Sequence, residues 1–378
     1  MSTYRDVPFV NLAAQYAAER EELLPILDAV LGTGQWVGGP VVEELEAELA
    51  REHNVPSVVS VGSGTDALRL SMLALGIGPG DEVITPPNSF VASTAAIVSV
   101  GARPVFADVL PDQTIDPQAV EAAITPRTKA IMPVHLTGRC ADMPALGALA
   151  QTKHLYIIED AAQAYGSTLH GRRAGTMGDV GCFSAHPLKN LNAAGDAGFV
   201  LCSTEAIGRR LLRLRNNGLH DRNTALEWGV VSRLDSVQAA VIRHRLRSLD
   251  RTIQRRREHA QQYREALNPT EVFVPPCEFH QFNTFHTFVV QVDRRDELAT
   301  RLAQDGIGTG IHYPRPIHLQ PAAAALGYKA GDFPVAERQS ERILSLPVHQ
   351  WLKPGDIDYV AECVNRFVAE WPVQRTGS

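Results

Sequence analysis

The chain has 378 residues, of which 44% are hydrophobic and 21% are charged, and its formal net charge is −6. This length allows roughly two or three domain-sized units, or one large domain with a small one attached, and the composition is typical of a soluble globular enzyme. The net negative charge argues against nucleic acid as the main partner, because binding to a phosphate backbone needs concentrated lysine and arginine.

Short apolar runs and helical patterns alternate through the first half of the chain. The runs that predict strands lie at residues 57–63, 81–87, 103–109, 129–136, 155–160 and 181–184. Apolar residues at helical spacing predict helices at residues 65–77, 89–101, 117–128 and 143–153. Strands that alternate with helices of this length predict an α/β fold with a mostly parallel sheet and helices on both of its faces.

The pattern changes after about residue 240. A long charged helix is followed by a predicted strand at 284–293, a helix at 295–307, a proline-rich segment at 312–321 and a terminal helix. We therefore predict a large α/β domain over residues 1–244, with an N-terminal arm over residues 1–40, and a smaller α+β domain over residues 245–378. The arginine-rich segment Arg243–Ala260 contains interleaved acids, so we interpret it as a solvated helix face rather than as a polyanion site.

The five cysteines are scattered, odd in number and without the spacing of metal ligands. They predict reduced, mostly buried thiols, with neither a disulfide framework nor a metal site. The N-terminus has no apolar segment of signal-peptide length, and no stretch approaches about 18 uninterrupted apolar residues. We expect a soluble, cytoplasmic protein that does not associate with a membrane.

A glycine-containing turn joins the first predicted strand to its helix, with the sequence VGSGTDAL at residues 61–68. Backbone N–H groups at this turn, a hydroxyl and the positive end of the helix would form a site for a phosphate group. Taken alone this signal is weak, because Thr65 or Asp66 acting as an ordinary helix N-cap explains the same sequence at least as well.

Asp160 ends the predicted strand at 155–160, and the carboxyl ends of parallel strands are where open α/β sheets bind ligands. An acid at this place would be partly desolvated, which is costly unless a cation lies beside it. The alternative is a structural cap for the helical turn that follows the strand.

Lys189 lies in the segment FSAHPLKNLNAAGDAG, residues 183–198, directly after a predicted strand and among small residues. For a single lysine an exposed surface position is the usual alternative, but a small-residue loop just beyond a strand end weakens it. A phosphate cradle, an acid at a strand end and a lysine in a tight loop are together the parts needed to hold pyridoxal phosphate. The acid pairs with the pyridine nitrogen, and the lysine supplies the Schiff-base amine.

These residues lie in motifs by which the chain resembles the sugar aminotransferases of the DegT/DnrJ/EryC/StrS group. The similar segments follow the order of the family over nearly the whole chain and include SGTDAL, ITPRTKAIMPVHLTGR, IIEDAAQAYGS, FSAHPLKNLNAAGDAG, SRLDSVQAA and HYPRPIHLQP. The resemblance implies a fold-type-I enzyme that depends on pyridoxal 5'-phosphate and forms a homodimer.

The resemblance also implies roles for individual residues. Lys189 would form the Schiff base and move the proton between substrate and cofactor, Asp160 would pair with the pyridine nitrogen, and Gln163 would reach the ring hydroxyl. The phosphate would be held by Gly64, Thr65 and Ser184, and Phe90 would stack on the ring. The sugar pocket would be lined by His186, His312, Tyr313 and His318, with a purely structural role as an equal alternative for His312 and His318.

Three positions depart from the family pattern. Ala185 stands in place of a frequent aromatic residue and Ala197 in place of a frequent glycine, which would reshape the pocket. Val231 stands where many relatives have an asparagine that contacts the phosphate from the neighbouring subunit, and valine cannot donate that hydrogen bond. Either Ser232 or Arg233 compensates, or the phosphate site is less shared between subunits.

The implied activity is transamination from L-glutamate to a nucleotide-linked keto sugar, with dTDP or UDP as the nucleotide and an amino sugar as the product. The motif PLKNL…GDAG is closer to the motif of relatives that aminate a 3-keto sugar than to that of relatives that act at C4. The alternatives are a 4-keto sugar or amino-cyclitol aminotransferase, a sugar dehydratase of the same fold, and a cofactor-binding regulator. Such dehydratases carry histidine at the lysine position, and such regulators usually carry an added DNA-binding domain, for which the sequence gives no sign.

Overall fold

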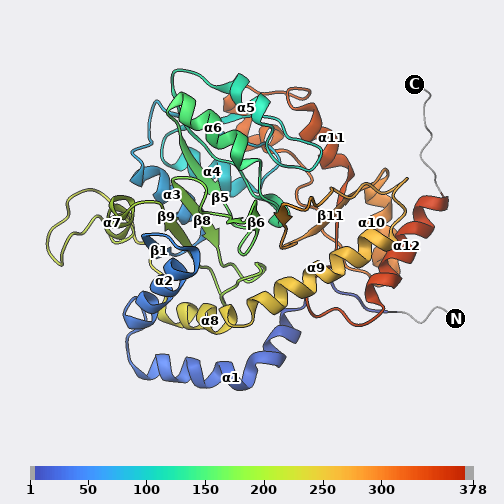
Figure 1. Cartoon of the computed structure of the whole chain (residues 1–378), viewed down its shortest axis with the longest axis horizontal. Coiled ribbons are helices and arrows are strands. Elements are labelled where there is room, and N and C mark those ends of the chain that lie inside the picture. Colours follow the sequence, from blue (N-terminus) through green and yellow to red (C-terminus); the bar gives the residue numbers. More distant parts are fainter. Residues whose placement is uncertain (1–4, 371–378) are drawn as a thin grey trace.

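The central sheet has seven strands. The structure, a computed structural model, describes residues 5–370 (Figure 1). The strands are β1 (Ser57–Val61), β2 (Glu82–Thr85), β3 (Arg103–Phe106), β4 (Thr128–Ile131), β5 (Tyr156–Asp160), β8 (Val180–Ser184) and β9 (Gly198–Cys202), in the order β1-β9-β8-β5-β4-β2-β3. Neighbours from β8 to β3 pair in parallel, whereas β9 is antiparallel to both β8 and β1. The predicted α/β fold with a mostly parallel sheet is confirmed, although the sequence analysis did not predict β9.

Both faces of this sheet are buried under helices. In β9, Phe199 and Leu201 join the core on one face, while Val200 and Cys202 join the core on the other, because successive side chains of a strand point to opposite faces. The first face is covered by α2 (Pro40–His53), α5 (Pro117–Ala123), α6 (Met143–Lys153) and α8 (Ser236–Leu246). The second face is covered by α3 (Gly64–Ala74), α4 (Val91–Ser99) and α7 (Glu205–Leu214).

The C-terminal part of the chain has a core of its own. It is built on the antiparallel strands β11 (Phe288–Gln291) and β12 (Ile343–Leu346) and on the helices α10 (Arg295–Gln304) and α12 (Asp356–Glu370). The helix α9 (Leu249–Ala266) contributes to both cores, since Ile253 packs into the large one and Tyr263 into the C-terminal one. The chain therefore passes from the large core to the C-terminal core within α9. The domain boundary near residue 245 stays a prediction.

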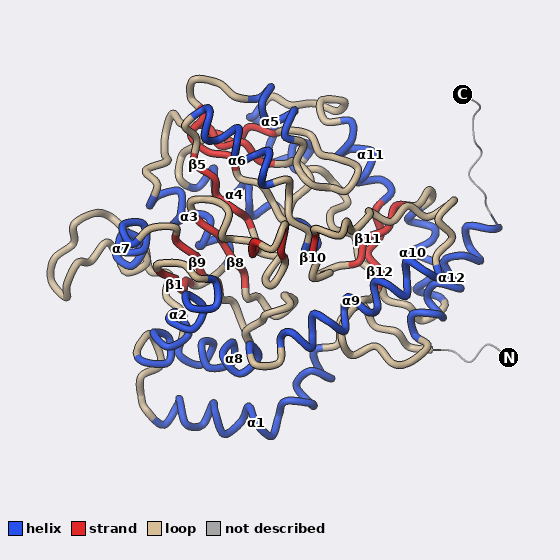
Figure 2. The backbone as a smooth tube through the Cα atoms, in the orientation of Figure 1, coloured by secondary structure: helices blue, strands red, loops and turns tan. Residues whose placement is uncertain are grey.

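The N-terminal segment ties the two parts together. Val7 forms a bridge with Ile307, and the carbonyl of Pro8 lies 2.9 Å from Nε2 of His349, so residues 5–11 lie on the C-terminal part. The helix α1 (Leu12–Gly32) then runs along α8 on the large part (Figure 2).

The remaining elements are short. A small sheet is formed by β6 (Thr168–Leu169), β7 (Arg172–Arg173) and β10 (Gln281–Phe282), and α11 (Pro334–Arg342) precedes β12. Short 3-10 helices lie at Leu136–Gly138, Ile317–Leu319 and Pro321–Leu326. The prediction of mostly buried thiols is confirmed, since all the cysteines are free and only Cys277 is partly exposed. Within residues 5–370, no helix combines the length and the apolar character that crossing a membrane requires.

Two arginines of the segment Arg243–Ala260 are engaged inside the protein. Arg245 pairs with Glu19, and its Nη1 donates to the carbonyls of Asn192 and Ala193 at 3.1 and 2.9 Å. Arg256 is only 8% exposed. The interpretation of this segment as a solvated helix face is therefore wrong for these two residues. Their partners lie far away in the sequence, so the local pattern of charges did not show that they are engaged inside the protein.

Candidate active site

A cavity of about 430 Å³ opens at the carboxyl ends of β5 and β8 and brings the predicted site residues together. It is lined by Gly64, Thr65, Phe90, Asp160, Gln163, Ser184, His186, Lys189, His312 and Tyr313, among others. Asp160 and Ser184 end two strands that pair in parallel, so their convergence follows directly from the sheet. His318 is not among the residues that line this cavity.

Lys189 lies in a tightly folded loop, residues 185–197, which we call the lysine loop. Its backbone N–H donates to the carbonyl of His186 at 2.8 Å, and the N–H of Ala193 donates to the carbonyl of Ala185 at 2.7 Å. The side chain of Asn192 closes the loop by donating to the carbonyl of Pro187 at 2.6 Å. These bonds fix the backbone from which the Lys189 side chain extends.

The environment of the Lys189 ammonium group favours its neutral form. Burial lowers the pKa of Lys189 from 10.5 to about 8, although the negative charge of Asp160 opposes this shift. Among the described residues no hydrogen bond or ion pair holds the ammonium group. In about a tenth of the protein molecules the Lys189 side chain is then a neutral, nucleophilic amine at pH 7.

Asp160 offers a buried carboxylate with space for a cation beside it. It is 4% exposed, Oδ2 accepts from the hydroxyl of Ser93 at 2.7 Å, and Oδ1 accepts from the N–H of Ala162 at 3.2 Å. Burial raises the pKa of Asp160, and these two hydrogen bonds partly oppose that effect. No arginine or lysine in residues 5–370 forms an ion pair with it, so a bound cationic group would satisfy its charge.

Gln163 and Tyr313 connect the large part to the C-terminal part across the cavity. Oε1 of Gln163 accepts from the N–H of Thr137 at 2.7 Å, and Nε2 donates to the hydroxyl of Tyr313 at 3.2 Å. Burial raises the pKa of Tyr313 to about 12, so this hydroxyl keeps its proton. The ring of Phe90 lies 5.4 Å from that of Tyr313 and is 53% exposed, which leaves an aromatic face free for a planar ligand.

The N-terminus of α3 forms an anion cradle. Its N-cap is Ser63, whose side chain accepts from the N–H of Asp66 at 3.1 Å, so the alternative that Thr65 or Asp66 is the cap is wrong. The N–H groups of Gly64 and Thr65 make no hydrogen bond within residues 5–370, and both residues line the cavity. Free amides at the positive end of a helix bind phosphate.

The floor of this cradle is held from a distant segment. The hydroxyl of Ser232 accepts from the N–H of Gly62 at 2.9 Å and donates to Oδ2 of Asp66 at 2.8 Å. Ser232 is therefore committed to its own chain and does not replace the asparagine expected at position 231. Val231 is 62% exposed, and the neighbouring Arg233 is exposed and without an ion pair in the described part of the chain.

Close approach of β9 to the cradle requires glycine at position 198. A Cβ atom there would lie 2.4 Å from the carbonyl oxygen of Ser63, which is backbone and cannot move aside cheaply. We expect Gly198→Ala to lower the free energy of unfolding by about 1–3 kcal/mol, measured by urea denaturation. The control is Gly147→Ala in α6, where a Cβ meets nothing within 4 Å and stability should rise slightly or stay unchanged. Equal stability of the two variants would contradict this account.

The histidines of the predicted sugar pocket divide into two groups. His186 and His312 line the cavity, and burial, together with the charge of Lys189, lowers the pKa of His312 to about 4. His318 lies elsewhere: its ring packs against Phe106 and Phe333, and its Nε2 is 3.0 Å from Oε1 of Glu337. This geometry is that of a structural histidine, so a substrate-binding role for His318 stays a prediction without support from its position.

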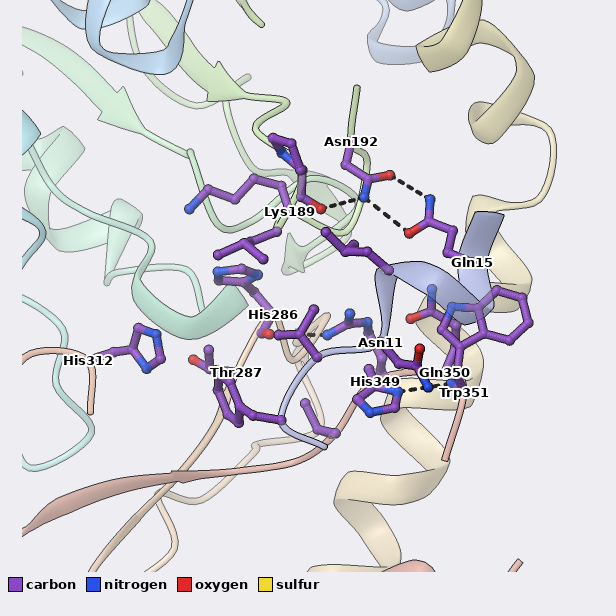
Figure 3. Close-up of a pocket in the computed structure, with 17 residues that line it drawn as sticks. Asn11, Gln15, Lys189, Asn192, His286, Thr287, His312, His349, Gln350 and Trp351 are labelled. Carbon is purple, nitrogen blue, oxygen red and sulfur yellow. Dashed lines mark hydrogen bonds between the residues drawn. The ribbon is translucent and has the colours of Figure 1, made fainter. Parts of the chain in front are cut away.

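The residues of the cavity that the sequence did not predict include Ser93 and His286. Ser93 lies within a predicted helix, and nothing in its local sequence shows that it reaches Asp160, 67 positions away. His286 precedes β11 and lies beside the lysine loop, as Figure 3 shows. Both contacts depend on packing between segments that are distant in the sequence.

Known proteins resemble this chain over most of its length. The sequence model of one family, described as the DegT/DnrJ/EryC1/StrS aminotransferase family, matches residues 17–365. The chain is 43% identical over 363 residues to the dTDP-3-amino-3,4,6-trideoxy-alpha-D-glucose transaminase of Streptomyces venezuelae, covering 96% of each chain. It is 42% identical over 363 residues to the UDP-N-acetyl-3-dehydro-alpha-D-glucosamine 3-aminotransferase of Acidithiobacillus ferrooxidans, covering 95% of this chain and 97% of the relative. The crystal structure of S. venezuelae DesV in complex with a ketimine intermediate superposes with a TM-score of 0.93 at 42% identity, covering 96% of this chain and 98% of that one.

Proposed function

The chain belongs to the DegT/DnrJ/EryC1/StrS aminotransferase family, and on this basis we propose that it transfers an amino group from L-glutamate to a nucleotide-linked 3-keto sugar. It is a pyridoxal-phosphate-dependent transaminase, as its relatives of known structure are. The observation that carries the proposal is the convergence in one cavity of Lys189, the buried carboxylate of Asp160 and the free amides at the start of α3.

The residues of the cavity fit pyridoxal phosphate. The amides of Gly64 and Thr65, with the hydroxyl of Ser184, would bind its phosphate. Asp160, which lacks a cationic partner among the described residues, would bind the protonated ring nitrogen. Gln163 would reach the ring hydroxyl, and the exposed ring of Phe90 would cover one face. When bound, the cofactor supplies an aldehyde that captures amines and a ring that accepts electrons from the substrate carbon.

Lys189 has two tasks in this mechanism. In the resting enzyme its amine would hold the cofactor at the aldehyde carbon. As a free amine it would take the proton from the donor carbon that bears nitrogen and then give it back, acting first as base and then as acid. A pKa of about 8 suits both directions of transfer near neutral pH. Donor and acceptor use the same cavity in turn, so ping-pong kinetics are expected.

Other activities of the same fold receive less support. Position 189 is a lysine, whereas dehydratases of this fold carry histidine there, which argues against a dehydratase. This lysine is partly buried and has a lowered pKa, which argues against a regulator without turnover. Amination at C4 and an amino-cyclitol product have no specific observation in their favour. We further propose a homodimer, in which the exposed Trp228 and Val231 would be covered, and the cytoplasmic location stays a prediction.

The test is the visible absorption spectrum of the purified protein with pyridoxal phosphate. A lysine-bound cofactor gives a yellow colour, which should bleach when L-glutamate is added. A protein that stays colourless with added cofactor would exclude the proposed function. A coloured protein that ignores L-glutamate would keep the cofactor site and exclude this donor.

The lowered pKa of Lys189 also predicts how cofactor uptake depends on pH. Only the neutral amine attacks an aldehyde, and with a pKa of about 8 its neutral fraction rises about tenfold between pH 7 and pH 9 and then levels off. We expect the same profile for the rate at which cofactor-free protein gains colour with pyridoxal phosphate. A rate that keeps rising about tenfold per unit up to pH 10 would indicate an ordinary exposed lysine instead.

A further inference from the structure

A smaller cavity of about 60 Å³ adjoins the active-site cavity and shares Leu188, Lys189, His286 and His312 with it. Its other walls come from the segment 9–15, from the lysine loop and from the segment 348–351 after β12, as Figure 3 shows. This volume holds about four water molecules or one carboxylate group, and it is too small for a sugar or a nucleotide.

The side chains that line this cavity include positively charged groups but no carboxylate. Arg256 and Lys189 are among them, and no aspartate or glutamate is. Burial lowers the pKa of His312 and His349 to about 4 and that of His286 well below its usual value, so these histidines are neutral near pH 7.

Arg256 is a buried cation that lacks a counter-ion. It is 8% exposed and forms no ion pair with any residue between 5 and 370. Burial lowers its pKa to about 10, so it still carries its charge at neutral pH. A buried charge left without a partner is costly, which indicates that something negative is bound beside it in the working protein.

The guanidinium group of Arg256 is satisfied along only one edge. Nη1 donates to the carbonyls of Phe285 and His286 at 3.3 and 3.1 Å. Nε is buried without a partner, and Nη2 makes no hydrogen bond to the described residues. The free edge formed by Nε and Nη2 is suited to a carboxylate, which accepts two parallel hydrogen bonds from arginine.

Further unpartnered polar atoms surround the same cavity. Nδ1 of His286, Oγ1 of Thr287, Oε1 of Gln350 and Nε1 of Trp351 are buried and have no hydrogen-bond partner in the described part of the chain. Native proteins pair nearly all buried polar atoms, so their concentration around one small cavity indicates a polar ligand. The hydroxyl of Thr287 and the indole N–H of Trp351 are both able to donate to an anion.

We propose that this cavity is the subsite for the side-chain carboxylate of the amino donor, which Arg256 binds through Nε and Nη2. The proposal rests on the transaminase function above and deepens it by assigning donor recognition. The donor's α-carboxylate is attached to the reacting carbon and stays with Lys189 in the main cavity, whereas the side-chain carboxylate of L-glutamate is long enough to enter the adjoining one. The keto-sugar acceptor carries its charge on a diphosphate that does not fit there, so Arg256 acts only in the donor half of the reaction.

The test compares two amino donors in the variant Arg256→Gln. The glutamine side chain can still donate a hydrogen bond to the two backbone carbonyls, but it lacks the positive charge and the paired N–H groups of arginine. L-glutamate has a side-chain carboxylate and L-alanine has none, and each is mixed with the cofactor-loaded protein while the loss of colour is followed. We expect the efficiency with L-glutamate to fall about tenfold to a hundredfold and that with L-alanine to change little. An equal loss with both donors would show a merely structural role and overturn the proposal.

A binding measurement makes the test independent of turnover. Glutarate, a dicarboxylate without an amino group, is titrated calorimetrically into the cofactor-loaded protein, and its Kd should rise about tenfold or more in Arg256→Gln. Thr287→Val should weaken glutarate binding without loss of stability, because its hydroxyl has no partner in the described residues. The matched control is Arg257→Gln, since Arg257 also donates to a backbone carbonyl, that of Asn283, but does not line the cavity.

The outcomes separate this proposal from the proposed function. If the protein is coloured and neither donor bleaches it, the proposed function with L-glutamate as donor fails whatever Arg256 does. If both donors bleach it and glutarate binds equally well to wild type and Arg256→Gln, only the subsite is overturned. If acetate binds at Arg256 without competing with L-glutamate, the cavity takes a free carboxylate and the assignment to the donor is wrong.

Discussion

Replacing Lys189 by alanine is expected to lower kcat by at least about 10⁴-fold and to abolish the yellow colour of the loaded protein. The side chain is the amine of the described cavity whose pKa, about 8, allows both attack on an aldehyde and proton transfer near pH 7. Colour is measured by absorption, and turnover by the release of 2-oxoglutarate from L-glutamate.

Two controls distinguish the loss of a catalytic group from a loss of folded protein. The free energy of unfolding of Lys189→Ala should not fall, because the ammonium group makes no hydrogen bond within residues 5–370 and its burial is a cost. Added small amines should restore part of the activity by supplying the missing base. Turnover within about tenfold of the wild-type value would exclude Lys189 as the catalytic residue.

Asp160→Asn is expected to lower kcat by about 10²–10³-fold while the protein stays folded. Asparagine has nearly the same volume and still accepts from Ser93, but it carries no charge to keep the ring nitrogen protonated. Kinetics with saturating cofactor separate this effect from weaker cofactor binding, which is measured as a rise in its Kd.

Ser93→Ala is the matched control for Asp160. It removes the 2.7 Å hydrogen bond to Oδ2 but leaves the carboxylate, so a loss of less than about tenfold is expected. If Asp160→Asn were as active as Ser93→Ala, the charge of Asp160 would have no role in catalysis.

Much of this site was predictable because it depends on strand ends. Parallel strands direct their carboxyl ends to one edge of a sheet, so Asp160 at the end of β5 and Ser184 at the end of β8 had to converge once the strands were recognised. The glycine turn before α3 and the lysine loop join the same edge. For these elements local sequence patterns are sufficient.

The missed features depend on contacts between distant segments. Ser93 reaches Asp160 only because α4 packs over the sheet, and Arg256 reaches the carbonyls of Phe285 and His286 because α9 lies against that segment. His318 was placed in the pocket by its motif, but the chain turns its ring toward Phe106 instead. A residue's own neighbours in the sequence do not report such packing.

The sharing of α9 between two cores has a consequence for how the protein unfolds. An uninterrupted helix with Ile253 in one core and Tyr263 in the other transmits the loss of either core to its neighbour. We therefore expect the two parts to unfold as a single cooperative unit, with amide protons that exchange with solvent together rather than in two separate classes. Arg256 lies between these two anchor points, so the amide protons around the proposed donor subsite should be among the most slowly exchanging of the protein.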